Sequence, residues 1–132
     1  MKLRSILLGA AALTLLSVTT AFAVDYVGGA IKTMDIGGKA VLTDANGMTL
    51  YTFDKDTAGV SNCYDACADN WPPLFAAEGA AAEGDFTLVT RTDGKMMWAF
   101  EGQPLYLWVK DQKPGDTTGD MVGEVWHTAI DD

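Results

Sequence analysis

The amino-acid sequence predicts an all-β protein, a single domain made of two pseudo-repeated antiparallel β-meanders with a short disulfide-pinned helical turn between them. Three observations lead to this prediction. One sequence pattern occurs twice, short apolar segments alternate with hairpin turns in both halves, and two cysteines lie four residues apart between the halves. An internal repeat indicates architecture more strongly than any single residue does.

The repeated pattern is Gly-x-x-Leu-Tyr-x-(Phe/Trp)-x-Lys-Asp. Its copies occupy residues 47–56 and 102–111, which are 55 residues apart. We expect the copies to take equivalent places in a duplicated fold, within repeat halves at about residues 30–56 and 86–111. The expected equivalences are Tyr51 with Tyr106, Phe53 with Trp108, Asp56 with Asp111 and, one residue out of step, Gly38-Lys39 with Gly94-Lys95.

Residues 1–23 have the features of a secretory signal peptide. Lys2 and Arg4 precede an apolar run over residues 6–16, which is too short to span a bilayer comfortably, and Ala21-Phe22-Ala23 is a typical cleavage site. No cysteine follows the apolar run, so no residue there can carry an N-terminal lipid. We expect a free, soluble protein of residues 24–132, periplasmic or secreted, with no membrane anchor after cleavage.

The length and charge of residues 24–132 limit the possible functions. A chain of 109 residues forms a single domain with one modest core. Loss of Lys2 and Arg4 leaves 7 basic and 18 acidic residues, a net charge of −11. Such a charge repels nucleic acid and anionic lipid, so neither is an expected partner.

Each half contains three segments that alternate with turn residues. Asn46-Gly47 and Asp93-Gly94 are hairpin signals, one in each half. A last strand is expected near the C-terminus, and a long surface loop before it. The predicted strands are residues 30–36, 39–43 and 48–53 in the first half, 86–90, 95–100 and 105–109 in the second, and 125–130 at the end.

Two cysteines in an exported chain are expected to form a disulfide. If Cys63 and Cys67 lie on one helical turn, their Cα atoms are about 6 Å apart, within disulfide range. Ser61 or Asn62 is a candidate cap for that turn, and Pro72-Pro73 would end it. Closing so short a loop stabilises the fold by only about 2 kcal/mol.

The repeated motif contains the candidate site residues. Side chains two apart in a strand share a face, so Tyr51 and Phe53 point together, as do Tyr106 and Trp108. These aromatic pairs form either part of the core, which typical burial favours, or a paired binding surface. Asp56 and Asp111 end the two copies and are expected to accept hydrogen bonds from their own turns.

The segments Tyr51-Thr52-Phe53-Asp54-Lys55-Asp56 and Tyr106-Leu107-Trp108-Val109-Lys110-Asp111 make the chain resemble a bacterial family of secreted repeats. Its members are often described as predicted lipoproteins with a Yx(FWY)xxD motif. The resemblance includes Cys63, Cys67, Trp71-Pro72-Pro73-Leu74 and the segment 123–127. Many members carry a lipid-attachment cysteine that this chain lacks. The resemblance implies export and a two-repeat β domain, and no established activity.

Metal binding is one alternative function. Thioether and imidazole ligands in an exported protein suit copper, and the candidates are Met34, Met48, Met96, Met97, Met121 and His127, with the cysteine thiolates if they are reduced. Met96 and Met97 are adjacent, so in a strand they face opposite sides. Asp111, Asp116 and Asp120 are conceivable calcium ligands without the spacing of an EF-hand.

Thiol redox chemistry is a second alternative. Thioredoxin-like sites place two residues between the cysteines at a helix start in an α/β fold. Here three residues separate Cys63 from Cys67, and Asp65 and Asp69 would disfavour a thiolate. A structural disulfide is therefore favoured.

The sequence favours an exported, non-enzymatic module that binds an envelope protein or a small ligand through its aromatic strands or acidic loops. No cofactor is expected, and no catalytic residue is assigned. His127, the one histidine, has no sequence neighbour that would make it a general base. A periplasmic copper-binding or electron-transfer accessory protein is the first alternative, and a thiol-redox protein is the second.

Overall fold

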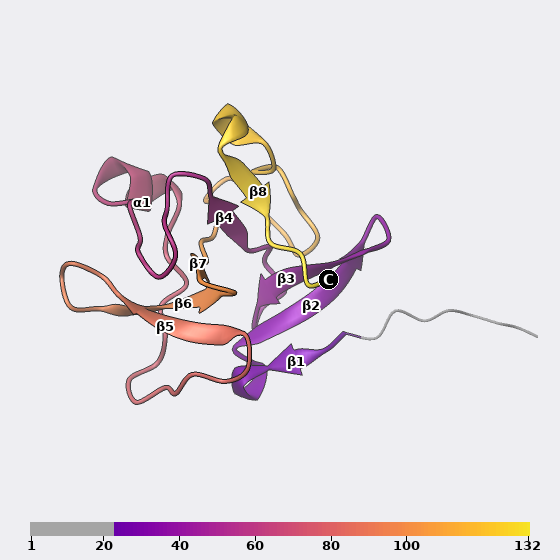
Figure 1. Ribbon diagram of the computed structural model, residues 1–132. Helices are drawn as coiled ribbons and strands as arrows, with labels where there is room; N and C mark the ends of the chain where they lie inside the picture. The colour runs from indigo at the N-terminus through magenta and orange to yellow at the C-terminus, as the bar shows by residue number, and fades with distance from the viewer. Residues whose placement is uncertain (1–22) are drawn as a thin grey trace, which may run out of the picture.

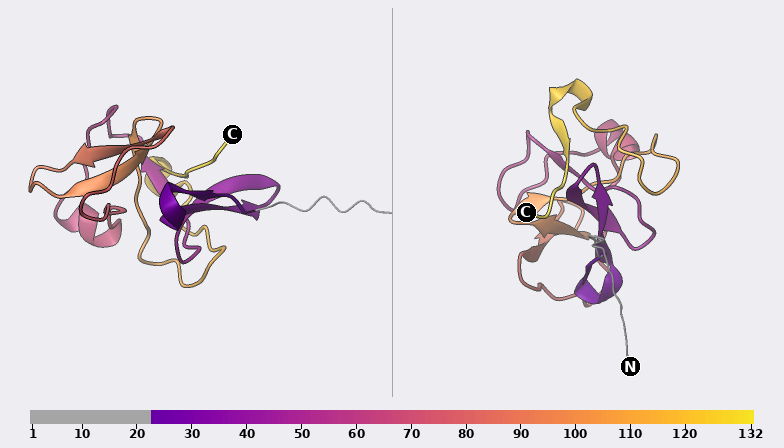
Figure 2. Two further views of the ribbon diagram at one scale, coloured as in Figure 1. Left: turned by 90° about the horizontal axis from the view of Figure 1, so that it is seen from below. Right: turned by 90° about the vertical axis from the view of Figure 1, so that its right-hand side faces the viewer.

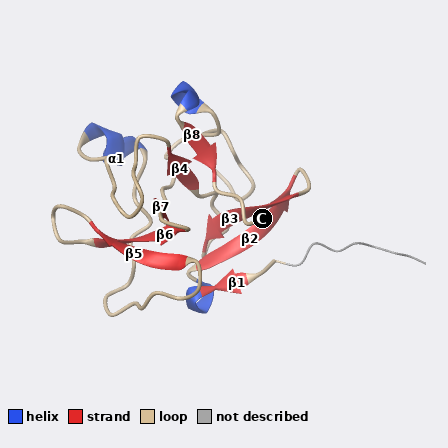
Figure 3. Cartoon of the chain, viewed as in Figure 1, coloured by secondary structure: helices blue, strands red, loops and turns tan. Residues whose placement is uncertain are grey.

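The computed structural model describes residues 23–132, so residues 1–22 of the predicted signal peptide lie outside the described part. The described chain consists mainly of short strands, turns and loops, with three single helical turns (Figures 1 and 3). The strands are β1 (Asp25–Tyr26), β2 (Ile31–Ile36), β3 (Lys39–Asp44), β4 (Tyr51–Phe53), β5 (Phe86–Thr90), β6 (Met96–Phe100), β7 (Gln103–Pro104) and β8 (Trp126–Thr128), and the helices are η1 (Val27–Gly29), α1 (Ala66–Asn70) and η2 (Val122–Glu124).

The first sheet has the order β1-β2-β3. Strands β2 and β3 pair antiparallel along their whole length, from Ile31 opposite Asp44 to Ile36 opposite Lys39. The turn between them, Gly37-Gly38, has positive φ at both residues, which suits the tight hairpin turns that follow the twist of the strands. Two glycines adopt this turn at no steric cost.

The second sheet has the order β5-β6-β7 and is also antiparallel. Phe86 lies opposite Phe100, and Thr90 lies opposite Met96. The turn follows the predicted Asp-Gly chemistry, since the Asp93 side chain accepts the backbone N–H of Lys95 at 2.9 Å. The hairpins β2–β3 and β5–β6 extend from the centre of the molecule in opposite directions (Figures 1 and 2).

Backbone hydrogen bonds repeat between the halves. In the first half, Leu50 N–H donates to Leu42 O at 2.9 Å; in the second, Leu105 N–H donates to Trp98 O at 2.9 Å. Both contacts continue a hairpin into a third segment, so each half has the meander order predicted from the sequence. The prediction of an all-β fold built from two repeats is confirmed.

The repeats exchange their last segments. Strand β8, from the end of the second repeat, pairs with β4 of the first, with Phe53 opposite Trp126. In the equivalent place, Leu107 N–H of the second repeat donates to Pro72 O of the first at 2.7 Å. Each half therefore depends on the other for its strand pairing.

The third strand of the second half differs from its predicted extent. Regular pairing ends at Pro104, whereas we expected a strand over residues 105–109. Beyond Pro104 the chain changes partner at each step, with Tyr106 bridged to both Tyr51 and Pro73. A hydrophobic pattern identifies buried residues, and it does not show that their hydrogen bonds go to three different segments.

Buried side chains form two clusters, one on either face of the central segments. The two motif tyrosines belong to the second cluster. The first cluster contains Ile31, Leu42, Leu50, Phe86, Trp98, Phe100, Leu105 and Ala129. The second contains Tyr51, Cys63, Trp71, Val89, Met97, Ala99, Tyr106 and Trp126.

The helical turn next to the cysteines begins later than predicted. Helix α1 starts at Ala66, so Cys63 precedes it and only Cys67 lies within it. Neither Ser61 nor Asn62 caps the helix; the cap position is Asp65, which makes no side-chain capping bond. The helix ends at Asn70, two residues before Pro72-Pro73, as predicted from this proline pair. Among residues 23–132, no helix has the length and apolar character needed to cross a membrane.

Candidate functional site

The two motif tyrosines meet at the centre of the molecule. Tyr51 N–H donates to Tyr106 O at 2.8 Å, and Tyr106 N–H donates to Tyr51 O at 2.9 Å. Both side chains are fully buried. This reciprocal pair marks the pseudo-twofold axis that relates the repeats, and it places both tyrosines in the core, as burial statistics predict.

Each tyrosine hydroxyl crosses to the aspartate of the other copy. Tyr51 O–H donates to Asp111 Oδ2 at 2.6 Å, and Tyr106 O–H donates to Asp56 Oδ2 at 2.7 Å. The carboxylates also bind their own loops, as predicted: Asp56 accepts Asn62 N–H at 2.7 Å, and Asp111 accepts Thr118 N–H at 2.9 Å. The motif therefore links the repeats through two exchanged hydrogen bonds.

Burial sets the acidity of these groups. It is the main cause that raises the pKa of Tyr51 and Tyr106, and the accepting carboxylates add to the increase. Burial also raises the pKa of Asp56, against the opposing influence of its hydrogen bonds and of Arg91. Both phenols are thus held neutral as donors.

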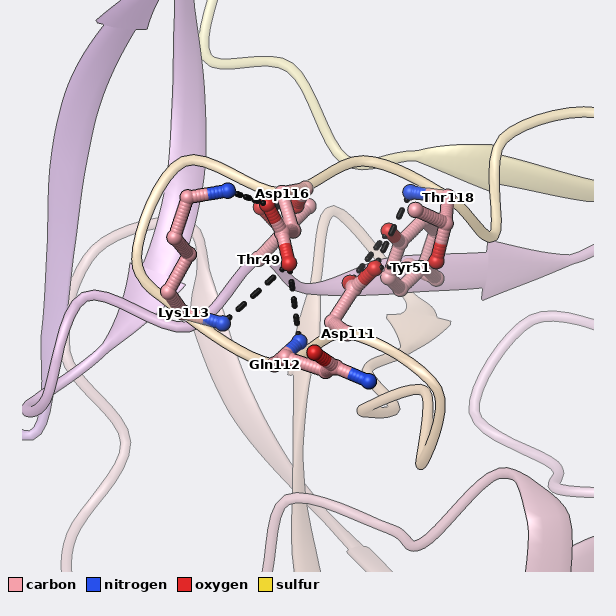
Figure 4. A network of polar contacts seen from close by, with 7 residues as sticks. All are labelled: Thr49, Tyr51, Asp111, Gln112, Lys113, Asp116 and Thr118. Atoms are coloured by element: carbon pink, nitrogen blue, oxygen red, sulfur yellow. Dashed lines mark hydrogen bonds and ion pairs between the residues drawn. The ribbon is translucent and has the colours of Figure 1, made fainter.

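The loop after the second copy closes over its carboxylate (Figure 4). Asp111 Oδ1 accepts both the N–H and the hydroxyl of Thr118. Further along the loop, Asp116 accepts Gln112 N–H at 2.8 Å and pairs with the Lys113 ammonium at 2.9 Å, and this pairing lowers its pKa. Thr49 Oγ1 donates to the carbonyl of Asp116 at 2.6 Å and ties the loop to the first repeat.

Four aromatic rings lie in one continuous stack. Trp71 and Trp126 are parallel at its centre, with centroids 3.8 Å apart and planes 3° apart. Phe53 stacks on Trp126 at 4.2 Å, and Trp108 stacks on Trp71 at 3.9 Å. Trp71 and Trp126 are 55 residues apart, as are Phe53 and Trp108, so the stack obeys the pseudo-twofold relation. The two central rings are buried and the two outer rings half-buried.

Gly119 lies against this stack. A Cβ atom at this position would approach Trp71 Cη2 to 2.8 Å and Tyr51 Cζ to 2.9 Å, closer than real Cβ contacts come. Its N–H donates to the Tyr51 hydroxyl at 3.2 Å. Only glycine allows the loop to approach the rings this closely.

A buried arginine supports the second tyrosine. Arg91 Nη1 donates to Ser61 Oγ at 2.9 Å, and Ser61 Oγ shares a 2.6 Å hydrogen bond with the Tyr106 hydroxyl. Arg91 Nη2 donates to Cys63 O at 2.7 Å, and the guanidinium lies 4.1 Å from the Tyr64 ring centroid. Arg91 was not predicted, and Ser61 was predicted only as a helix cap, since neither residue belongs to the repeated pattern.

Cys63 and Cys67 form the predicted disulfide, with Cα atoms 5.3 Å apart. Cys63 is fully buried. Its carbonyl receives the Arg91 bond, so the disulfide holds the segment that anchors the arginine. We expect reduction to lower the free energy of unfolding by about 2 kcal/mol.

That expectation is tested by comparing urea denaturation of the oxidised protein and the Cys63→Ser/Cys67→Ser variant. The intact mass of the exported protein should equal residues 24–132 less two hydrogens. Free thiols that react with an alkylating reagent in the unfolded, unreduced protein would contradict the disulfide, and a retained segment 1–23 would contradict cleavage.

The methionine and histidine candidates do not form one ligand cluster, although Met121 N–H donates to the carbonyl of Trp126, the residue before His127, at 2.7 Å. Met97 is buried in the second core cluster, while Met96 is half-buried and its sulfur accepts the Thr90 hydroxyl at 3.1 Å. Met121 is 53% exposed, and His127 Nε2 shares a 2.7 Å hydrogen bond with Asp54 Oδ2. Within residues 23–132, no hydrogen bond or salt bridge joins these four side chains to one another.

The proposed calcium ligands are also held apart. Asp111 and Asp116 are occupied by the loop contacts described above, and Asp120 accepts Thr128 N–H at 3.1 Å. Within residues 23–132, no three or more His, Cys, Asp or Glu side chains gather in a way that could hold a metal ion.

The surface has two grooves at equivalent places in the repeats. The larger groove, of about 560 Å³, lies between the β5–β6 turn and the segment after Phe75. Its lining residues include Phe75, Ala76, Glu78, Leu88, Lys95 and Met96. The smaller groove, of about 500 Å³, lies between the β2–β3 turn and the C-terminal segment. Its lining residues are Gly38, Lys39, Ala40, Ile130, Asp131 and Asp132.

The sequence pointed to part of this geometry. Gly38-Lys39 and Gly94-Lys95, which the extended repeat aligns, line the two grooves. The 55-residue offset also places Phe75 on Ile130, opposite those turns. Phe75 was not identified, although continuing the alignment beyond the motif to Trp71 and Trp126 would have found it.

These features define a class of protein: a duplicated β domain whose repeats exchange strands, aromatic rings and tyrosine–aspartate hydrogen bonds. A family model described as a secreted repeat of unknown function matches residues 32–75 and again residues 87–130. The chain therefore belongs to this family of secreted repeats, as its motif indicated. No curated protein and no solved structure matches the chain.

Proposed function

We propose that this secreted-repeat protein is a non-enzymatic binding module of the cell envelope, periplasmic or secreted, that holds a small apolar ligand in the larger groove. The observation that supports this proposal is the exposed ring of Phe75. It is 48% exposed and lines a groove whose other walls are largely aliphatic. The groove volume falls in the range of small-molecule sites, which are mostly apolar with few polar groups.

The engagement of the motif residues supports a binding function over catalysis. A general acid or base must reach a substrate proton. The Tyr51 and Tyr106 hydroxyls instead donate to Asp111 and Asp56 and hold the repeats together. The motif is therefore the scaffold, and the groove is the part available to a ligand.

One wall of the groove rests on paired strands, and residues 76–80 of the other wall form a turn and loop. Leu88 belongs to β5 and Met96 to β6, and these strands pair in register. On the opposite wall, Ala76 N–H donates to Met96 O at 3.0 Å, and Phe75 is bridged to Met97. The strand wall needs little ordering when a ligand binds, and this lowers the entropic cost of binding.

We expect the protein to bind the neutral fluorescent probe N-phenyl-1-naphthylamine, and Phe75→Ala to weaken this binding about tenfold, or about 1.4 kcal/mol. Fluorescence titration measures both affinities. Val109→Ala is the matched control, because Val109 is 50% exposed and does not line the groove. Equal affinity in the Phe75→Ala variant would place the probe elsewhere. Absence of probe binding would favour an envelope protein as the partner.

Copper capture remains the alternative suggested by residue type, with electron transfer as its variant. It would require Met121, which is exposed, to approach His127, whose ring is paired with Asp54. An anaerobic Cu(I) titration of the parent and of the Met121→Ala/His127→Ala variant distinguishes it from the binding proposal. Thiol redox activity has less support, because Cys63 is buried and its carbonyl is bonded to Arg91.

A further inference from the structure

We infer that the ligand of the larger groove is an anionic amphiphile, a free molecule with an apolar chain and a carboxylate head group. The inference rests on the proposed function and adds the charge of the ligand. The apolar chain would lie against Phe75, Leu88 and Met96, and the carboxylate would meet the ammonium group of Lys95, which lines the same groove.

Comparison of the two grooves supports this charge. Each has one lysine from a Gly-Lys turn. In the smaller groove Lys39 shares the lining with Asp131 and Asp132, two carboxylates that lower the positive potential there, although no salt bridge within residues 23–132 joins them to Lys39. In the larger groove Lys95 faces mainly apolar side chains, with Glu78 as the one acidic lining residue. The larger groove, with one acidic lining residue, therefore keeps more of the positive charge of its lysine than the smaller groove, which has two.

The ammonium group of Lys95 is available to a ligand. It forms no salt bridge with any residue between 23 and 132. Nζ lies 5.5 Å from the centroid of the exposed Phe75 ring. A cation above an aromatic ring keeps its donors free for a carboxylate, which gains from a charge-assisted hydrogen bond next to an apolar wall.

The charge of the whole chain favours a free amphiphile over a membrane surface. The sequence carries 18 acidic and 9 basic residues, so an anionic bilayer is repelled by most of the molecule. A single small anion needs only the local field of Lys95. The binding groove therefore suits a monomeric acid such as a fatty acid.

The test is displacement of bound N-phenyl-1-naphthylamine by decanoate, decanol and decyltrimethylammonium, which share an apolar chain and differ in head-group charge. We expect decanoate to bind best. Lys95→Gln should weaken decanoate about fivefold, which is the upper range for an exposed charge pair, and leave decanol within about twofold. Glu78→Gln should strengthen decanoate by removing the one acidic lining residue.

Lys39→Gln, in the equivalent groove, is the matched control and should leave decanoate unchanged. Equal binding of decanoate and decanol, or equal losses in Lys95→Gln and Lys39→Gln, overturns the anionic ligand while leaving the apolar site intact. Failure of all three compounds to displace the probe overturns the proposed function as well. The protein is also tested against phosphatidylglycerol vesicles by co-sedimentation. Tighter binding to these vesicles than to decanoate would show that the partner is a lipid surface and not a free acid.

Discussion

Replacing Trp126 by alanine is expected to lower the free energy of unfolding by about 3 to 5 kcal/mol, the range for removing a large buried aromatic side chain. The ring is only 4% exposed and contacts both repeats. It stacks on Phe53 and Trp71, and it makes an edge-to-face contact with Tyr106, with ring centroids 5.2 Å apart. Its loss therefore opens a cavity where the halves meet.

Urea denaturation measures this effect, and circular dichroism supplies an independent check. The near-ultraviolet circular dichroism of the stacked indoles should change when Trp126→Ala removes one of the two central rings. Trp108→Ala is the comparison, because Trp108 is half-buried at the end of the stack and should cost less. If Trp108→Ala destabilised the protein more than Trp126→Ala, the stack would not be the centre of the fold.

The repeat architecture could be predicted because equivalent residues of the two copies occupy equivalent buried positions, so the same residue types recur. The β5 strand was predicted at its observed bounds, and β2, β3 and β6 to within one residue at each end, since glycine turns limit them. The disulfide followed from export and spacing. The strand bounds and the disulfide could be predicted because each depends on residues close together in the sequence.

The exchange between repeats could not be predicted from local pattern. A Tyr-x-aromatic-x-x-Asp motif shows that Tyr51 and Asp56 recur, and it does not show that Tyr51 bonds Asp111 instead. Hydrogen bonds between residues 60 positions apart depend on how the halves dock. The same limit applied to residues 105–109. The hydrophobic pattern correctly indicated buried residues such as Leu105 and Tyr106, but it did not predict which segments their backbones pair with.

The groove shows a third limit. Lys95 and Met96 stood out in the sequence for other reasons, as a repeated turn and as a metal ligand. Their common environment depends on Phe75, which lies 20 residues before Lys95 and reaches it through the bridge to Met97. The repeat alignment locates both grooves, but it does not show how they differ, because the equivalent lining residues Phe75 and Ile130 are of different kinds.

The variant Tyr51→Phe/Tyr106→Phe should be less stable than the parent at neutral pH, and the difference should shrink in alkali. Each substitution removes a hydrogen bond to a carboxylate, worth about 1.5 to 3 kcal/mol. The two sites touch, so their losses need not add. The raised pKa of each folded phenol exceeds the value of 10.0 expected on unfolding. The folded state therefore holds these protons more tightly, and this stabilisation is complete below pH 10 and declines above it.

Urea denaturation at a series of pH values from neutral to strongly alkaline tests this expectation. Tyr26→Phe is the control: its hydroxyl donates to Asp131 instead of joining the motif copies, and the side chain is only half-buried. It should cost less than either motif substitution. A double variant as stable as the parent at neutral pH would show that the exchanged tyrosine–aspartate bonds do not hold the repeats together. A stability difference that stays constant above pH 10 would show that the phenols ionise equally in the folded and unfolded protein.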